Sequence, residues 1–355
     1  MKNKRDIYCE YDFWEAFYKM EDEILRDRNR RRLWDSFNKF LSANRLFFNI
    51  AIQDVNEETP GGKYIKDLMQ SRGGANIKFI PQKYPQLGEF TDNDNYKLNA
   101  VYLTTKNDSE CKDLSKRFGI IVFNLSMIFA ADHVYRDNGI SFVRNGDQNW
   151  NYLLNLRECV PSINYCNALV VVDRYLLYDT NENAFQGNLS PIFDSLLPDS
   201  LDNGIIFTIC IIAEINKERV ASIEGKYDLL ESLIKELRPN LNFILTIYNS
   251  RYIHDRSIIT NNIILTSGAG FDVIGSNDQP LRFTTTSLCF PFLLSDKNEM
   301  YLEWINNILK EKNKHRIYQQ DYWGDRTKKN HLLDYYYERP IRPQPTYIVH
   351  NIACI

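Results

Sequence analysis

Short apolar runs alternate with amphipathic segments along most of the chain, and this alternation constrains the fold more than any other feature of the sequence. In the first half, the expected strands are 46–55, 77–80, 100–105 and 120–124, and the expected helices are 11–43, 63–71 and 106–119. In the second half, the expected strands are 168–179, 205–214 and 243–249, and the expected helices are 189–197, 226–237 and 299–314. Strands and helices that alternate in this way build α/β layers around a mostly parallel sheet.

The length of the chain predicts two domains. At 355 residues, the chain exceeds the size at which a single hydrophobic core usually stops growing. The turn-rich stretch 137–150 is the candidate boundary, which predicts domains over 1–145 and 150–355. We expect two three-layer α/β domains. The first is PIN-like or Rossmann-like with a helical start, and the second has a mixed sheet because 260–262 predicts a hairpin turn. A C-terminal helix and an extended tail at 335–349 complete the second domain.

The composition is that of a globular protein of the reducing cytoplasm. The 22 Tyr, 20 Phe and 5 Trp residues argue against disorder, because such side chains are normally buried or stacked. The seven cysteines form no CxxC pair, which favours reduced thiols over a disulfide framework or a zinc site. The sequence contains no recognisable secretory leader and no apolar run long enough to span a bilayer, so we expect a cytoplasmic protein. A net charge of −3 confines any nucleic-acid site to a local patch.

The stretch 252-YIHDRSIITNNIILTSGAGFDVIGS-276 contains the most informative motif. His254 is followed by Arg256 at +2, Asn261 at +7 and Gly268 at +14. This spacing resembles the H-x-K-x4-D motif and Gly-Ser turn of phospholipase D-type phosphodiesterases. The resemblance implies a histidine nucleophile that forms a phosphohistidine, a lysine that neutralises phosphate oxygens and an aspartate that orients the imidazole.

A closer resemblance is to the phospholipase D-like carboxy-terminal domain that follows the microtubule-interacting and trafficking domain in certain eukaryotic proteins. There, too, I-H-D-R-x-I runs through a polar turn and an apolar strand into a G-x-G-(aromatic/aliphatic)-D segment, which here is Gly268, Gly270, Phe271 and Asp272. The resemblance covers roughly residues 165–290. It implies a phospholipase D-like sheet that binds rather than cleaves.

Three departures from the motif favour phosphate binding over nucleophilic catalysis. Arg256 replaces lysine, Asn261 replaces aspartate and Ala269 replaces serine, and asparagine lacks the charge that would stabilise an imidazolium. A single motif copy would also require a homodimer to supply the second histidine. His254 is therefore the catalytic candidate, and the phosphate-binding candidates, which need no cofactor, are Arg256, Arg251, Asn261, Ser267, Gly268, Asp173 and Arg174. The alternative interpretation is a structural histidine and an Asp173–Arg174 ion pair at a strand end.

Carboxylates follow two of the predicted strands in the first half. Asp54, Glu57 and Glu58 follow one strand, and Asp108 follows another. Carboxylates at adjacent strand ends hold Mg²⁺ in PIN-type nucleases, where the metal activates water for phosphodiester cleavage. These residues therefore predict a magnesium site, while the alternative is that they are ordinary loop and helix-cap residues of a partner-docking domain.

The densest basic cluster is 26-RDRNRRRLW-34, within the first predicted helical region. Its simplest interpretation is a solvated helical face, and its functional interpretation is a patch that contacts phosphates. The sequence contains no P-loop, dinucleotide-binding, HExxH or GxSxG motif.

These features together predict a protein that binds or processes a nucleic-acid phosphodiester. Enzymatic activity would make it a nuclease or phosphodiesterase. The frequent Asn, Ile, Lys and Tyr residues and the paired nuclease-like modules suggest, by analogy, a bacterial phage-defence system. The main alternative is a non-catalytic subunit that docks a protein partner through the tail at 335–349. A weaker alternative is binding of an anionic lipid head group.

Overall fold

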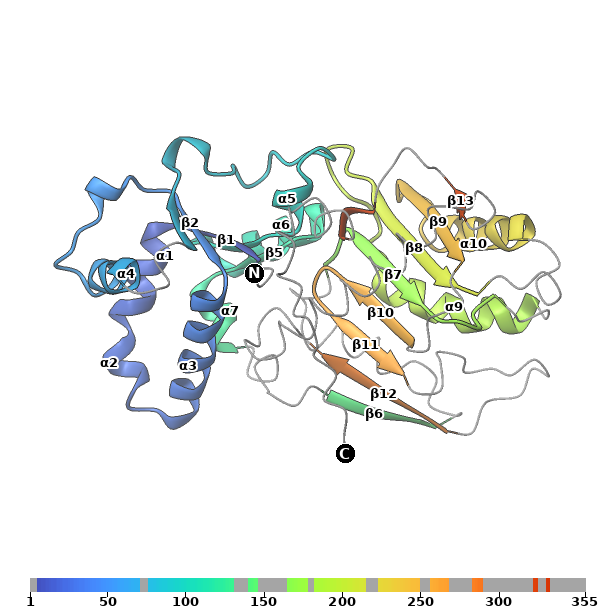
Figure 1. The fold of residues 1–355 in the computed structure, drawn as a ribbon, viewed down its shortest axis with the longest axis horizontal. Coiled ribbons are helices and arrows are strands. Elements are labelled where there is room, and N and C mark those ends of the chain that lie inside the picture. The colour runs from blue at the N-terminus through green and yellow to red at the C-terminus, as the bar shows by residue number, and fades with distance from the viewer. Residues whose placement is uncertain are drawn as a thin grey trace, which may run out of the picture.

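The computed structural model describes residues 5–70, 76–130, 140–145, 165–177, 182–214, 223–249, 256–267, 283–289, 322–324 and 330–332. Two β-sheets, one of five and one of eight strands, lie side by side with helices packed against them (Figure 1). The predicted α/β class with two sheet-containing domains is therefore confirmed. The predicted helix 299–314 and the tail 335–349 lie outside the described residues.

The first sheet is entirely parallel, with strand order β3-β2-β1-β4-β5. Its strands are β1 (Asp6–Cys9), β2 (Arg45–Phe48), β3 (Ile77–Phe79), β4 (Val101–Leu103) and β5 (Ile121–Phe123). The central strand β1 was not predicted, because four residues next to a charged N-terminus give too short a pattern for an apolar run. The predicted strand 46–55 is shorter than expected, since β2 ends at Phe48 and a 3₁₀ turn, η1 (Ile52–Asp54), follows.

The predicted helical region 11–43 is three helices rather than one. They are α1 (Tyr11–Lys19), α2 (Glu21–Ile24) and α3 (Arg28–Ala43). Their contacts are largely aromatic: the rings of Phe17 and Trp34 stack with centroids 4.0 Å apart, and Trp14 packs edge-on against Phe48 of β2. The remaining elements of this unit are α4 (Pro60–Gln70), η3 (Pro81–Lys83), α5 (Asn95–Leu98), α6 (Asp108–Phe118) and α7 (Leu125–Ala130).

Helix α6 shows how local sequence sets its ends. Asn107 is the N-cap, and its side chain accepts from the amide of Glu110 at 3.0 Å while Glu110 bonds back to the amide of Asn107, which completes a capping box. The sequence suggested Asp108 or Ser109 as the cap, so the observed cap lies one or two residues earlier. The predicted end at Gly119 is confirmed, and this glycine adopts the left-handed conformation with φ 62°.

The second sheet is mixed, with strand order β13-β9-β8-β7-β10-β11-β12-β6. Strands β7 (Ala168–Val172), β8 (Phe207–Ala213) and β9 (Phe243–Asn249) are mutually parallel. The antiparallel strands are β10 (Arg256–Thr260), β11 (Ile264–Ser267), β12 (Phe283–Cys289), β6 (Ile140–Asn145) and β13 (Tyr322–Gly324). The crossovers α9 (Glu182–Leu196) and α10 (Ile223–Leu237) contact each other, so both cover the same face of this sheet (Figure 1). The predicted mixed sheet and its hairpin turn at 260–262 are confirmed.

Strand β6 alters the expected division of the chain. Residues 140–145 were assigned to the first domain, yet β6 pairs with β12 at the edge of the second sheet. Polar and glycine residues surround 140-ISFVRN-145, so this segment was interpreted as a turn-rich boundary. Its partner strand β12 lies more than a hundred residues later in the chain. The second sheet therefore begins before the predicted boundary at 150.

The two units meet through the amino-terminal ends of their parallel strands. Arg5, just before β1, donates from Nε to the carbonyl of Asn99 at 2.9 Å and from Nη1 to the carbonyl of Asn261 at 3.0 Å. Asn167, just before β7, donates to the carbonyls of Leu98 and Gly119 at 2.9 and 3.0 Å. Because the parallel strands of both sheets run outward from this junction, the carboxyl ends of the two parallel sets lie at opposite ends of the molecule (Figure 1).

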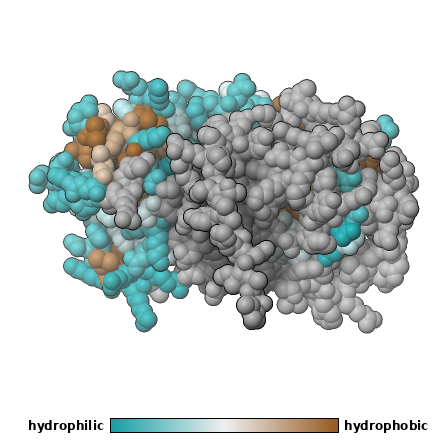
Figure 2. Space-filling view, viewed as in Figure 1, coloured by the Kyte–Doolittle hydropathy of each residue, from teal (hydrophilic) through white to brown (hydrophobic). Residues whose placement is uncertain are grey.

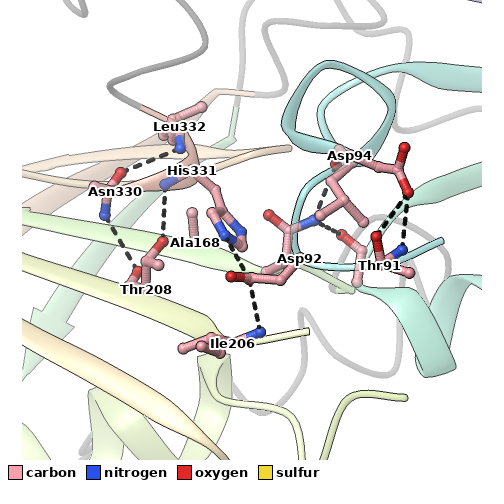
Figure 3. Close-up of polar contacts among 12 residues, drawn as sticks. Thr91, Asp92, Asp94, Ala168, Ile206, Thr208, Asn330, His331 and Leu332 are labelled. Carbon is pink, nitrogen blue, oxygen red and sulfur yellow. Dashed lines mark hydrogen bonds and ion pairs between the residues drawn. The ribbon is translucent and has the colours of Figure 1, made fainter. Parts of the chain in front are cut away.

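A short segment around His331 is fixed in the same junction (Figure 3). The imidazole Nε2 lies 3.0 Å from Oδ1 of Asp92, which belongs to the first unit. The backbone N–H of His331 donates to Oγ1 of Thr208 in β8 at 3.0 Å, and its carbonyl accepts from the side chain of Asn99 at 3.0 Å. Since His331 is 6% exposed, this segment is a buried bridge between the two sheets.

Candidate anion-binding site at the end of strand β7

The site begins where the buried strand β7 ends. Every residue of β7 is buried, and Asp173 follows it with only 2% of its surface exposed. The amide of Asp173 still donates to the carbonyl of Ile212 in β8 at 3.1 Å. Its Oδ1 then accepts from the amide of Tyr175 at 2.9 Å, an aspartate turn that ends the strand. This turn places Arg174 and Tyr175 at the carboxyl end of the parallel strands, where open α/β sheets usually bind ligands.

Two arginines are held at this end by buried carboxylates. Arg256 is the first residue of β10, which runs antiparallel to β7, and its Nε lies 3.6 Å from Oδ1 of Asp173. Arg174 Nε lies 2.5 Å from Oε2 of Glu214, which follows β8. The side chain of Arg256 is 19% exposed and that of Asp173 is 2% exposed. The side chain of Arg174 is 27% exposed and that of Glu214 is 12% exposed. The cluster is neutral in sum, but its positive groups are the ones that face solvent.

Tyr175 is the exposed part of this cluster. It is 41% exposed, and the guanidinium carbons of Arg174 and Arg256 both lie 5.3 Å from its ring centroid. Guanidinium groups at this distance interact favourably with an aromatic ring, so each arginine is held by a carboxylate and also by the ring. The arrangement can offer an aromatic face and two fixed cations to one ligand.

The structure brings together four of the predicted phosphate-binding residues. Asp173, Arg174 and Arg256 form the cluster, and Ser267 of β11 lies directly opposite Arg256 in the strand register. Ser267 is 6% exposed. The candidates His254, Arg251 and Gly268 lie outside the described residues.

Asn261 lies at the other end of β10, in the junction between the sheets. Its Oδ1 accepts from the amides of Asn167 and Ala168, each at 3.0 Å. Its Nδ2 donates to Oδ1 of Asn99 and, at 3.2 Å, to Oδ1 of Asn167. Both amide hydrogens and the oxygen are thus used within the protein, and Asn261 is 1% exposed. This geometry gives Asn261 a structural role away from the site for which the sequence suggested it.

Sequence reasoning missed Tyr175 and Glu214. The run 168-ALVVVDRYLLYD-179 was interpreted as one strand, which hid the turn at Asp173 and the exposed ring that follows it. The polar pair Asp173–Arg174 inside an otherwise apolar run was the available signal, because a charged pair seldom continues a buried strand.

The four carboxylates predicted to hold magnesium do not form one group. Asp54, Glu57 and Glu58 lie in the connection between β2 and α4, and Glu57 is paired with Lys66. Asp108 begins α6, where its Oδ1 accepts from Nδ2 of Asn124 at 2.7 Å and from a serine hydroxyl, and these bonds lower its pKa. Among the described residues, no three His, Cys, Asp or Glu side chains are grouped closely enough to hold a metal ion.

The carboxyl ends of β1 and β4, where the strand order of the first sheet reverses, are bridged by a residue that the sequence analysis passed over. Glu10 follows β1, and its Oε1 accepts from Oγ1 of Thr104 at 2.8 Å. Its Oε2 accepts from the amide and hydroxyl of Thr105 at 2.7 and 2.9 Å. Glu10 was overlooked because β1 itself was not recognised. Its carboxylate links the ends of β1 and β4 at the point where open α/β sheets usually bind ligands.

Comparisons with known proteins do not place the chain in a family. No protein-family model matches it, and no curated protein matches it. Among solved structures, the chain is similar to TrmBL2, an archaeal chromatin protein whose structure shows a novel mode of DNA binding, with 13% identity and a TM-score of 0.23. The match covers 48% of this chain, and the chain spans about half (52%) of the archaeal protein. This TM-score is too low to establish a shared fold. None of the helices in the described part of the chain is long and apolar enough to cross a membrane.

Proposed function

We propose that the protein binds a nucleic-acid phosphodiester at the Arg174–Tyr175–Arg256 cluster. One observation carries the proposal: Tyr175 is 41% exposed, and two guanidinium groups lie 5.3 Å from its ring centroid, each anchored by a buried carboxylate. Arginine suits phosphate because its planar fork can donate two parallel hydrogen bonds. An exposed aromatic ring adds a surface on which a base can stack.

The aromatic ring favours a nucleic acid over an isolated phosphate or a lipid head group. A free phosphate needs cations only, and would gain nothing from an exposed ring of Tyr175. Binding to an anionic membrane surface depends on an extended basic or amphipathic face, and two arginines at one strand end do not form such a face. Stacking combined with localised cations is the usual composition of single-stranded nucleic-acid sites.

The proposal includes processing of the same bond. His254 precedes Arg256 by two residues, so a cleavage reaction at this end of the sheet would be that of a nuclease or phosphodiesterase. The setting that we propose is a bacterial defence system, and its support is the composition and the resemblance of the stretch 252–276 to phosphodiesterases. Cleavage of labelled DNA and RNA in EDTA by the wild type and by His254→Ala tests the catalytic part.

Binding is tested by fluorescence anisotropy with labelled single-stranded DNA and RNA. Arg256→Ala and Tyr175→Ala are expected to weaken binding, and the effect of Arg256→Ala should shrink as salt rises because it removes a phosphate contact. Lys235→Ala is the matched control, since it removes one exposed cation from α10, away from the cluster. Equal affinities of Arg256→Ala and wild type across the salt series would contradict the proposal.

A further inference from the structure

The end of the helical pair α2–α3 carries an unusual concentration of charge. Residues 26–32 contain five arginines and one aspartate, a local charge of +4, in a chain whose net charge is −3. The other residues therefore sum to −7. Glu21, Asp22, Glu23 and Asp35 flank this run, so residues 21–35 sum to zero and the positive charge is concentrated in the turn before α3 and at the start of that helix.

Four of these arginines are exposed and have no ion pair in the described part of the chain. We call Arg26, Arg28, Arg31 and Arg32 the arginine tip. Arg30 is different, because its Nη1 lies 3.4 Å from Oε1 of Glu23. Glutamates and aspartates occupy neighbouring positions on α2, yet they leave the four cations of the tip unpaired. The tip therefore presents unneutralised guanidinium groups to solvent.

Buried residues of α3 directly follow the arginine tip. Leu33 and Trp34, directly after the arginines, are buried, and Trp34 stacks on Phe17 with an interplanar angle of 12°. Arg28, Arg31 and Arg32 thus project from a packed helix, and Arg26 lies in the turn just before it. Arg28 and Arg32 are four residues apart on α3 and Arg28 and Arg31 are three apart, which places their side chains on one helical face.

The amino-terminal end of α3 is capped by an aspartate. Asp27 directly precedes the helix, and its Oδ1 accepts from the amide of Arg30 at 3.3 Å, which satisfies a free amide at the positive end of the helix. The arginines that follow Asp27 add their charge at this same end of the helix.

We propose that the arginine tip is a second contact surface for the phosphate backbone of a nucleic acid. A protein partner is less suited to it, because interface centres are apolar and aromatic, and Leu25 is the exposed large hydrophobic residue beside the tip. Figure 2 shows this end of the molecule, at the lower left, as mostly hydrophilic with one small hydrophobic patch. Contacts to phosphates need only placed cations.

This inference extends the proposed function, since both surfaces take the same class of ligand. The tip belongs to the first unit, while the Arg174–Tyr175–Arg256 cluster lies at the carboxyl end of the second sheet, far across the molecule (Figure 1). A long nucleic acid is needed to reach both. A short oligonucleotide is expected to occupy the cluster alone or the tip alone.

The test measures affinity for a long duplex and for a short single strand as salt is varied. The tip variant is Arg28→Ala with Arg32→Ala, and its control is Lys112→Ala with Lys116→Ala. The control pair is also exposed, unpaired and four residues apart on a helix, α6. Loss of two phosphate contacts should reduce the slope of log affinity against log salt by about 2, at roughly 0.9 per contact. The control variant should keep the wild-type slope.

The outcomes separate this inference from the proposed function. A tip variant with reduced affinity and slope supports the inference, even if Tyr175→Ala binds like the wild type and the proposed cluster is thereby excluded. A tip variant with wild-type affinity and slope overturns the inference, whatever Tyr175→Ala does. Tighter binding of polyglutamate than of the duplex by the wild type would also overturn it, because an acidic protein would then be the better partner.

Discussion

The side chain of Asn261 donates a hydrogen bond to the side chain of Asn99, 162 residues earlier in the chain. Both asparagines precede or follow a strand at the junction of the two sheets, and both are buried. The junction is therefore built from amide groups that satisfy one another, an arrangement that fixes the relative position of the sheets more specifically than apolar contact alone. The same placement directs the carboxyl ends of the two sheets away from each other.

Asn261→Ala is expected to destabilise the protein without altering the anion site directly. The substitution leaves the amides of Asn167 and Ala168 without their acceptor, and unsatisfied buried groups cost about 1–3 kcal/mol each, so we expect a loss of about 3 kcal/mol in the free energy of unfolding. Urea-induced unfolding measures it. Asn240→Ala, at an exposed position, is the control and should change stability by less than about 0.5 kcal/mol. Similar small effects at both positions would contradict the assigned role.

Gly119 is expected to be required for the contact between the two units. Its φ is 62°, and a Cβ atom there would lie 2.4 Å from the carbonyl oxygen of Cys166. Gly204 has a similar φ of 71° with nothing within 4 Å of such an atom, so Gly204→Ala measures the backbone strain alone, about 1–2 kcal/mol. Gly119→Ala should cost roughly 2 kcal/mol more, in thermal or urea unfolding, because of the additional clash. Equal losses would mean that the junction adapts.

The sequence predicted the parts of the fold that depend on local pattern. The helix ending at Gly119 and the hairpin turn at 260–262 follow from residue types whose backbone preferences are strong. It missed β1 and β6, because each is a short strand whose identity depends on distant partners: β1 on two flanking strands and β6 on β12.

The sequence predicted only those residues of the candidate site that a local pattern could indicate. Asp173, Arg174 and Arg256 were suggested by charged residues at the end and start of strands, and strand pairing then brings them together. Asn261 has the spacing of a motif residue but lies at the far end of a strand five residues long. The motif spacing does not show at which end of β10 a residue lies, because this depends on where the strand begins. Tyr175 is exposed because of the turn at Asp173, which was not predicted because residues 168–179 were interpreted as one strand.

Cys111 gives a prediction for alkaline pH. Burial, aided by the nearby carboxylates of Asp108 and Glu110, raises the pKa of its thiol from 9.0 to about 12. The unfolded chain releases this proton at lower pH than the folded chain, so the contribution of the thiol to stability is complete below pH 9 and is lost as the pH rises toward 12. The difference in unfolding free energy between wild type and Cys111→Ala should therefore shrink between these pH values. A difference that stays constant would mean that the thiol does not titrate as expected.

Tyr175 offers the most direct test of how the anion site recognises its ligand. If a base stacks on the ring, Tyr175→Phe should bind single-stranded nucleic acid nearly as well as the wild type, because the aromatic ring remains next to the two guanidinium groups. Tyr175→Ala should lose about 1–3 kcal/mol, or roughly 5- to 150-fold in Kd. Tyr175→Leu separates stacking from simple apolar contact, since leucine provides apolar surface without a π face, and it should bind as weakly as alanine. Wild-type affinity of the leucine variant would show that the exposed ring is not a stacking platform, and the two arginines would then have to account for binding alone.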